Sequence, residues 1–281
     1  MPLIAFSKDN LAGETIAKSL IGTYSFDPQP DLVSQDGKYS WKNWKHGDIQ
    51  LIELTTMHIF SDYLKDYPLF NKDDLLIFAS THKSDTNAPA LTVHTCGNFT
   101  AANKMGGNPS EIAHASASAI KIAYQFLSKN TLPNFPSFIE ATHHGPTALK
   151  SPVLFAEIGS TDTEYANQDA GELMARCLLE VCKEWKYKRK AVDADRVAIG
   201  FGGTHYCQKF TKLMLDSNFE FPYIFSKYGL PEANSLTIRQ AIEKSLEPVE
   251  IALIEKKSMN AQTRDQLIAS LKEVGLNYEM V

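Results

Sequence analysis

The residues best suited to chemistry in this sequence are Glu140, His143 and His144. They follow the short apolar run 137–139 and precede a Gly-Pro pair. A strand should therefore deliver a carboxylate and two adjacent imidazoles to the end of a sheet and then turn away. Imidazoles exchange protons near neutral pH, and neutral ones bind transition metals. The stretch indicates a catalytic or metal site, although an isolated His-His pair is equally typical of an ordinary surface loop.

Three other stretches have the same form, an apolar run with strand character followed by a histidine. Including the first stretch, five of the eight histidines lie at such exits. Parallel strands share one edge at their carboxyl ends, and ligands bind in the crevice outside that edge. These side chains are therefore expected to meet in one site. The three further histidines are His82, His94 and His205, after residues 75–79, 90–93 and 197–201.

Two kinds of chemistry fit this inventory. Imidazoles and carboxylates bind zinc, and an open coordination position would lower the pKa of a bound water towards about 7. Without a metal, the same groups would act as general bases. Gly202 and Gly203 precede His205, and their backbone N–H groups are expected to form an anion-binding nest. The sequence contains no HExxH, GxSxG, Walker or GxGxxG motif, which disfavours four common enzyme classes.

The elements that must position these residues alternate between strands and helices. Residues 23–45 are polar and turn-rich and are expected to form a loop. With no repeat and no linker, the order predicts one α/β domain over residues 1–281, with three layers and a mostly parallel or mixed sheet. Strands are expected near 3–6, 49–54, 75–79, 90–93, 137–139, 153–158, 197–201, 223–225 and 250–254. Helices are expected up to about residue 20 and over about 109–126, 162–187, 206–215, 236–244 and 261–271.

Composition limits the class of protein. The net charge is −5 and the sequence pI about 5.9, so no global positive field indicates a nucleic-acid partner. The four cysteines have no metal-finger spacing and are expected to be reduced thiols. No signal peptide or membrane span is recognised, so a cytoplasmic protein is expected. One basic tract, 183–190, includes two aromatics, and it is typical either of a solvated helix end or of phosphate contacts.

Four tracts in order resemble the archaeal and plant type of the D-aminoacyl-tRNA deacylase family. Two shorter tracts, Ser7-Lys8-Asp9 and Ser226-Lys227-Tyr228, fit as well, so the resemblance spans nearly the whole chain. Cys207-Gln208-Lys209 departs from the Ala-Pro-Arg common in the family, and Thr95-Cys96 stands where Pro-Thr is expected. The four tracts are residues 82–99 with their His-Lys-Ser, Pro-Ala-Leu-Thr-Val-His and Gly-Asn-Phe elements, 140–146, 157–160 and 200–206.

The resemblance implies a monomeric, cytoplasmic, zinc-dependent hydrolase with a fold like that of nucleoside phosphorylases and peptidyl-tRNA hydrolases. Its partner would be the acceptor end of D-aminoacyl-tRNA, whose ester it cleaves, and neither DNA nor a membrane. His143 or His144 would activate water, Glu140 would orient an imidazole, and Gly202 and Gly203 would stabilise the oxyanion. Metal ligands would come from His82, His94, His143, His144 and His205. Substrate contacts would come from His82, Lys83, His94, Asn98, Phe99, Thr204 and His205. Separately from the resemblance, the local positive charge alone predicts phosphate contacts along Lys186, Lys188, Arg189 and Lys209.

Two other functions remain open from the residues alone. One is a phosphorylase or hydrolase acting on free nucleosides, which would use the glycine nest for phosphate. The other is a non-catalytic module that binds RNA or a metal. Binding alone would not require so many groups that titrate near neutrality, so the sequence favours an enzyme.

Overall fold

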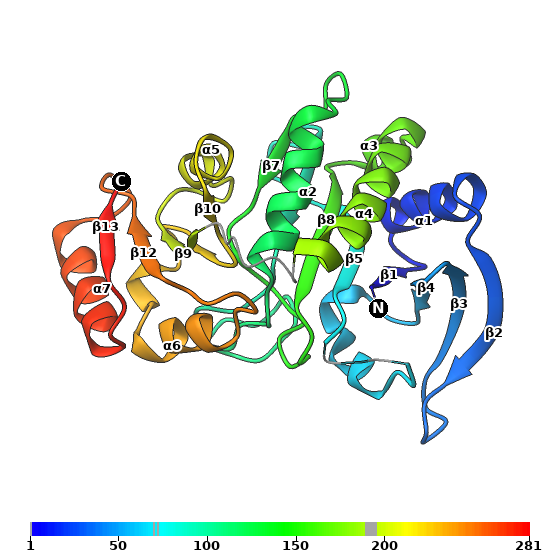
Figure 1. The fold of residues 1–281 in the computed structure, drawn as a ribbon, viewed down its shortest axis with the longest axis horizontal. Helices are drawn as coiled ribbons and strands as arrows, with labels where there is room; N and C mark the ends of the chain where they lie inside the picture. Colours follow the sequence, from blue (N-terminus) through cyan, green and yellow to red (C-terminus); the bar gives the residue numbers. More distant parts are fainter. Residues whose placement is uncertain (1, 70, 72, 189–195) are drawn as a thin grey trace.

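The computed structural model describes residues 2–69, 71, 73–188 and 196–281 (Figure 1). An eight-stranded mixed sheet forms its larger part, and β1, β4, β5 and β8 run parallel at its centre. β6 runs antiparallel to β8, and β7 runs parallel to β6. In spatial order the strands are β2 (Asp27–Val33), β3 (Ser40–His46), β4 (Ile49–Leu54), β1 (Leu3–Ser7), β5 (Leu76–His82), β8 (Val153–Gly159), β6 (Ala90–His94) and β7 (Ser137–Ile139).

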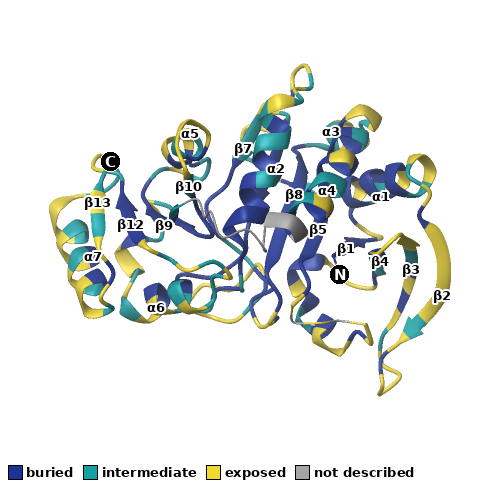
Figure 2. Cartoon of the chain, in the orientation of Figure 1, coloured by how far each residue is buried: buried dark blue, intermediate teal, exposed yellow. Residues whose placement is uncertain are grey.

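The central strands are buried on both faces, as their continuous apolar runs predict (Figure 2). Ile77 and Ala79 point towards helices α1 (Leu11–Thr23), α2 (Ala117–Lys129) and α4 (Gln168–Lys188). Leu76 and Phe78 point to the other face, where the 3₁₀ segment η1 (His58–Asp66) covers them. A single turn of helix, α3 (Asp162–Tyr165), precedes α4. The sheet is therefore the middle of three layers, as predicted.

A second, five-stranded sheet is entirely parallel. Helix α5 (Gln208–Asp216) packs on one face and shares its apolar core with α2 and α4 of the larger sheet. Helices α6 (Ser235–Glu243) and α7 (Ala261–Glu273) cover the other face, close to η2 (Leu230–Glu232). The strands are β9 (Arg196–Phe201), β10 (Phe219–Glu220), β11 (Ile224–Phe225), β12 (Ile251–Ile254) and β13 (Tyr278–Met280).

The two sheets are joined by the backbone that follows β7. Ala141 N donates to His205 O at 2.9 Å, Cys207 N to Ile139 O at 3.1 Å, and Thr142 N to Ile224 O at 3.0 Å. The segment that carries the Glu140-to-His144 motif thus continues from the edge of the large sheet onto the carboxyl ends of β9 and β11. This seam places residues of both sheets around one point.

The expected loop over residues 23–45 is wrong, because this region forms the antiparallel hairpin β2–β3. Pro28 and Pro30 fit the exposed outer strand, where no further strand needs their missing N–H groups. Trp41 on β3 is fully buried and packs edge-on against Tyr67, 5.2 Å between ring centroids.

The expected helix start near residue 109 is also wrong, because α2 begins at Ala117 with Ser116 as its N-cap. Residues 109–110 form a turn instead, and residues 112–115 are held in extended pairings, including Ala113 N to Cys96 O. The Glu247 carboxylate accepts hydrogen bonds from Ala117 N and Ser118 N and fixes the first turn.

The predicted helix over 162–187 is divided into α3 and α4, and β10 and β13 were not predicted. Across the described ranges, no helix has the length and apolarity needed to span a membrane.

Candidate active site at the seam between the sheets

Glu140 lies at the centre of the site and is 2% exposed. One carboxylate oxygen, Oε1, lies 2.9 Å from His82 Nδ1. The other, Oε2, contacts His205 Nε2 directly and lies 3.7 Å from His143 Nε2. His82 Nε2 in turn is 2.7 Å from the Tyr206 hydroxyl. One buried carboxylate therefore orients imidazoles that come from both sheets.

The pKa values around Glu140 show that its charge is retained. Burial alone would raise the pKa of Glu140, but the hydrogen bonds to His205 and His82 outweigh it and hold the pKa well below its usual range. Burial would lower the pKa of His82, yet the Glu140 and Glu157 carboxylates raise it. An anionic Glu140 therefore holds the proton of His82 on the nitrogen that faces it.

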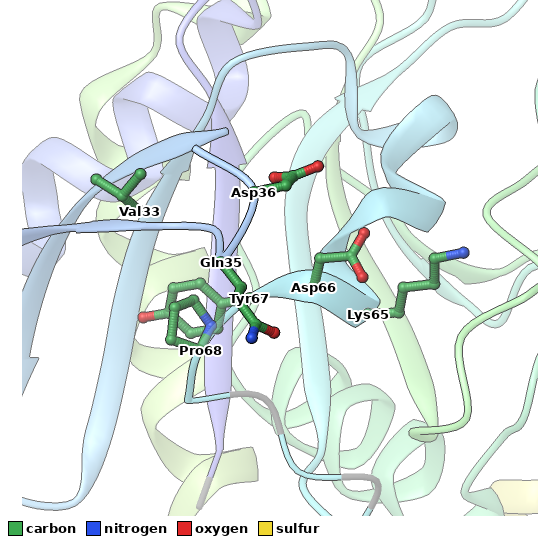
Figure 3. Close-up of a pocket in the computed structure, with 7 residues that line it drawn as sticks. All are labelled: Val33, Gln35, Asp36, Lys65, Asp66, Tyr67 and Pro68. Carbon is green, nitrogen blue, oxygen red and sulfur yellow. The ribbon is translucent and has the colours of Figure 1, made fainter. Parts of the chain in front are cut away.

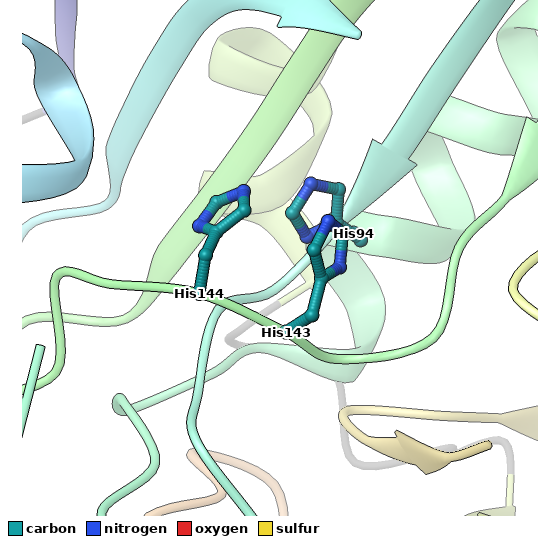
Figure 4. Close-up of side chains that lie close together, drawn as sticks. All are labelled: His94, His143 and His144. Carbon is teal, nitrogen blue, oxygen red and sulfur yellow. The ribbon is translucent and has the colours of Figure 1, made fainter. Parts of the chain in front are cut away.

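His94, His143 and His144 form a second group beside the first, and their rings gather on one side of the loop after β7 (Figure 4). One ring nitrogen of each lies within 4.8 Å of the others. Each Nδ1 faces a backbone carbonyl: Thr95 O at 3.0 Å, Ala141 O at 2.7 Å and Gly145 O at 2.7 Å, respectively. A carbonyl only accepts, so the protons lie on Nδ1. The three Nε2 atoms are left with free lone pairs, the form in which histidine binds a metal.

The electrostatics of this second group favour a cation. Burial and the neighbouring imidazoles lower the pKa of His143 and of His144, so both rings are neutral at pH 7. Burial would also lower the pKa of His94, but the Glu157 and Glu140 carboxylates outweigh it and raise the pKa. His94 Nε2 is buried without a hydrogen-bond partner, 3.6 Å from Glu157 Oε2. A field that attracts a proton to this position attracts a metal ion in the same way.

The turn that carries His144 is held by close backbone packing. His144 has a φ of +47°, in the left-handed region that is rare for residues with a side chain. A Cβ on Gly145 would lie 2.3 Å from Gly107 N and 2.7 Å from Ile59 O, so only glycine fits there. Gly145 N donates to Met105 O at 3.1 Å. Loop 105–107 and η1 thereby fix the direction of the imidazole.

All five predicted histidines do meet, but the expectation that they share one edge of a parallel sheet is wrong. β6 runs antiparallel to β8, so His94 pairs with Phe155 in the middle of that strand. His205 follows β9 in the second sheet. The residues meet because the segment after β7 crosses the seam.

The premise for the oxyanion role of Gly202 and Gly203 is also wrong, because neither amide is free. Gly202 N donates to Phe225 O at 2.8 Å, and Gly203 N donates to Ser258 Oγ at 2.7 Å. The carboxylate of Glu255 lies beside them. These glycines are required instead by conformation and space, since their φ values are +134° and +77°.

The predicted substrate contacts are of two kinds. Asn98 and Phe99 are buried: the Asn98 amide donates to Gly106 O and Asn108 O, and Phe99 stacks on Phe225. Both hold the surrounding loops and, at 7% and 6% exposed, present little surface to a substrate. Lys83, Thr204 and Lys209 are exposed next to the site. Arg189 lies outside the described residues, and the structure describes only the backbone of Lys186 and Lys188, at the end of α4.

Four residues around the site were not among those predicted from the sequence. Glu157 and Tyr206 contact His82 or His94, and both lie within the conspicuous tracts 157–160 and 200–206. Phe155 stacks on His94, with ring centroids 5.2 Å apart. His58 packs against Phe155 and lies 2.8 Å from Ser80 Oγ through Nε2. Phe155 lies inside a strand, where the pattern used for prediction could not find it. His58 follows the run 49–54 by four residues, as His205 follows 197–201, so the same pattern could have found it.

The burial of His58 predicts a loss of stability in acid. Burial lowers its pKa from 6.5 to about 4. Below about pH 6.5 the unfolded chain therefore binds a proton at this histidine, whereas the folded chain does not. As the pH falls from about 6.5 to about 4, the free energy of unfolding decreases. Replacing His58 by Leu should remove up to about 3 kcal/mol of that decrease. Urea unfolding of the wild type and the variant between pH 7 and pH 4 measures it, and exposed His46→Asn should keep the wild-type slope.

A hollow of about 750 Å³ lies elsewhere, between the tip of the β2–β3 hairpin and the end of η1 (Figure 3). Its lining includes Val33, Asp36, Lys65 and Tyr67, and none of its lining residues belongs to the histidine groups. Its titratable residues include Asp36, Lys65 and Tyr67, but no lining residue belongs to a group of metal-ligating side chains found among the described residues. The candidate active site is therefore the seam.

Comparison with known proteins identifies the family of the chain. A family model described as D-aminoacyl-tRNA deacylase matches residues 69–279. The D-aminoacyl-tRNA deacylase of Methanosarcina acetivorans is 34% identical over 278 residues, covering 97% of this chain and 90% of its own. That of Thermococcus onnurineus is 32% identical over 282 residues and 99% of each chain. A crystal structure of a conserved protein of unknown function superposes with a TM-score of 0.82 at 25% identity, covering 100% of this chain and 95% of that one. This chain belongs to the D-aminoacyl-tRNA deacylase family.

Proposed function

We propose that this chain hydrolyses the ester of D-aminoacyl-tRNA at the seam, with a zinc ion held by His94, His143 and His144. Family membership supports the reaction. The observation that supports the site is the set of three Nε2 atoms left free by backbone carbonyls on Nδ1. Three histidines leave a coordination position open, as in catalytic zinc sites. Bound there, zinc would supply a water of lowered pKa and polarise the ester carbonyl.

The chain's own residues supply proton transfer. Glu140 is anionic and its Oε2 contacts His205 Nε2, so a proton shared between these two atoms lies on Nε2 and leaves Nδ1 as an acceptor. This is the arrangement by which a buried carboxylate fixes the tautomer of a catalytic histidine. The His205 side chain is 41% exposed and stands at the mouth of the site. His205 would take a proton from the attacking water and deliver it to the ribose oxygen as the ester C–O bond breaks, so that the tRNA leaves with a free hydroxyl.

The setting of the reaction follows from the same features. Both histidine groups are complete within one chain, which supports a monomer as the working unit. The substrate is the acceptor end of tRNA, which supports action in the cytoplasm, with neither DNA nor a membrane as partner. Sedimentation of the purified protein, alone and with D-aminoacyl-tRNA, tests the stoichiometry; a dimer would contradict it.

The nucleoside phosphorylase alternative requires an anion-binding site for phosphate. It relied on free amides at Gly202 and Gly203, which are occupied by Phe225 O and Ser258 Oγ. The nearby Glu255 carboxylate would repel phosphate. A site without a phosphate cradle fits hydrolysis by water better than phosphorolysis.

Hydrolysis of matched D- and L-tyrosyl-tRNA, with and without a chelator, tests the proposal. Release of the D-residue alone, lost on chelation and restored by zinc, is the expected result. Elemental analysis should find zinc in the wild type and in exposed His46→Ala, and much less in His94→Ala. Full activity in metal-free protein would remove the zinc role, and equal hydrolysis of both substrates would contradict the stated specificity.

A further inference from the structure

A hollow of about 610 Å³ opens beside the site, on the other side of the end of β5. It lies outside the carboxyl ends of β1, β5 and β8, where open α/β sheets bind ligands. His82 and Lys83 are adjacent at this point: the His82 imidazole turns to Glu140, while exposed Lys83 lines the hollow. Adjacent side chains of an extended chain point in opposite directions, so the hollow and the reacting centre share one strand end.

The lining of this hollow combines an apolar wall with hydroxyls and charges of both signs. Met57 and Leu11 are exposed to 47% and 37% and supply the apolar part. Lys83 supplies an ammonium group, Asp9 and Asp162 carboxylates, and Asn87 an amide. A simple anion would meet the two carboxylates with one ammonium group to hold it, and an apolar molecule would leave the polar groups without partners. A nucleotide suits all of them, with a flat base, ribose hydroxyls and one phosphate.

The wall of the hollow is tied to the reacting centre by hydrogen bonds. The Tyr165 hydroxyl lies 3.0 Å from His82 O and 2.8 Å from Ser160 O, and its one proton serves either carbonyl. Ser84 Oγ lies 3.2 Å from Ser160 Oγ. On the other side of the strand end, His82 Nε2 lies 2.7 Å from the Tyr206 hydroxyl. A molecule seated in the hollow therefore rests against residues that fix His82.

We propose that this hollow binds the 3′-terminal nucleotide of tRNA, with Lys83 on its phosphate and Met57 against its base. This rests on the proposed function and names the part of the substrate that the site grips. The terminal nucleotide is common to every aminoacyl-tRNA, so a fixed polar pocket can bind it whatever the amino acid. The ester carbon would then reach across the end of β5 to the histidines.

The first experiment measures binding directly, so it does not depend on turnover. AMP and adenosine are titrated into the full chain and into three variants by calorimetry. Lys83→Gln should weaken AMP about 5- to 10-fold, the usual effect of losing a charge-assisted contact, and should leave adenosine nearly unchanged. Met57→Ala should weaken both ligands by a similar factor. Lys65→Gln is the matched control, because Lys65 is an exposed lysine in the hollow of Figure 3.

The second experiment measures deacylation of D-tyrosyl-tRNA by the same proteins. KM should rise about 5- to 10-fold in Lys83→Gln with kcat within twofold of the wild type, and Lys65→Gln should match the wild type. Equal AMP affinity in Lys83→Gln and wild type, an unchanged KM, or a change in kcat alone would overturn the proposal. A KM effect that varies with the amino acid would also overturn it, by assigning the hollow to the aminoacyl side chain. A wild type that binds AMP through Lys83 but deacylates neither substrate would refute the proposed function while leaving the nucleotide site intact.

Discussion

Replacing Glu140 by Gln is expected to lower kcat for D-tyrosyl-tRNA hydrolysis by about 10³-fold, within the range for loss of general acid–base function. The two oxygens of Glu140 face His82 Nδ1 and His205 Nε2. A glutamine offers one oxygen and one NH₂ group, so one of these nitrogens would meet a donor and its ring would have to move its proton to the other nitrogen. A flipped His205 tautomer no longer presents a base to water.

The control for this variant is Glu247→Gln. Glu247 is also a carboxylate with several partners, but it caps α2 and accepts from Ser116 and Ser118. Its replacement should cost about 1 kcal/mol of stability and leave kcat unchanged. Single-turnover rates and thermal unfolding of both variants separate the two effects. If zinc-loaded Glu140→Gln retains more than a tenth of the wild-type rate, Glu140 does not orient the base.

Replacing Gly145 by Ala is expected to lower the free energy of unfolding by about 3 kcal/mol and the rate by at least about 10²-fold. The new methyl group would lie 2.3 Å from Gly107 N, 2.5 Å from Gly106 C and 2.7 Å from Ile59 O. All three are backbone atoms, so no side chain can rotate to make room. The turn itself must shift, and it carries His144 away from His94 and His143.

Gly22→Ala is the matched control for this substitution. Gly22 lies in α1, and a Cβ there would meet no heavy atom within 4 Å. Alanine should stabilise the helix by about 0.5 kcal/mol without any change in rate. Chemical unfolding and deacylation rates of the two variants compare them directly. Wild-type activity in Gly145→Ala would show that the direction of His144 is unimportant.

The sequence was sufficient to predict the site residues whose position depends on local pattern. Apolar runs of four to seven residues mark buried strands, and the residue type after each run is visible without any tertiary information. His82, His94 and His205 were predicted in this way, and so was the α/β class with its three layers. The family resemblance adds the reaction to this, on tracts that include both Glu140 and Glu157.

What the sequence did not predict depends on partners far away in the chain. An apolar run looks the same whether its strand is parallel or antiparallel, so the direction of β6 was not predictable. The start of α2 is set by Glu247, 130 residues beyond Ala117. Free amides were expected at Gly202 and Gly203 because a glycine pair before a helix suggests them, but Ser258 arrives from another loop to accept from Gly203.

The seam between the two sheets has a thermodynamic consequence. His94, His143 and His144 belong to the larger sheet and its loops, whereas His205 belongs to the smaller sheet. A substrate held between these residues binds only the form of the protein in which the two sheets are packed against each other. By mass action, such a ligand stabilises the docking by RT ln(1 + [L]/Kd), or about 2.7 kcal/mol at a hundredfold excess over Kd. Bound substrate therefore holds the two sheets together. A substitution at Thr142 or Ile224, neither of which touches a reacting atom, alters the affinity for substrate, because the docking of the sheets and the binding of substrate are linked.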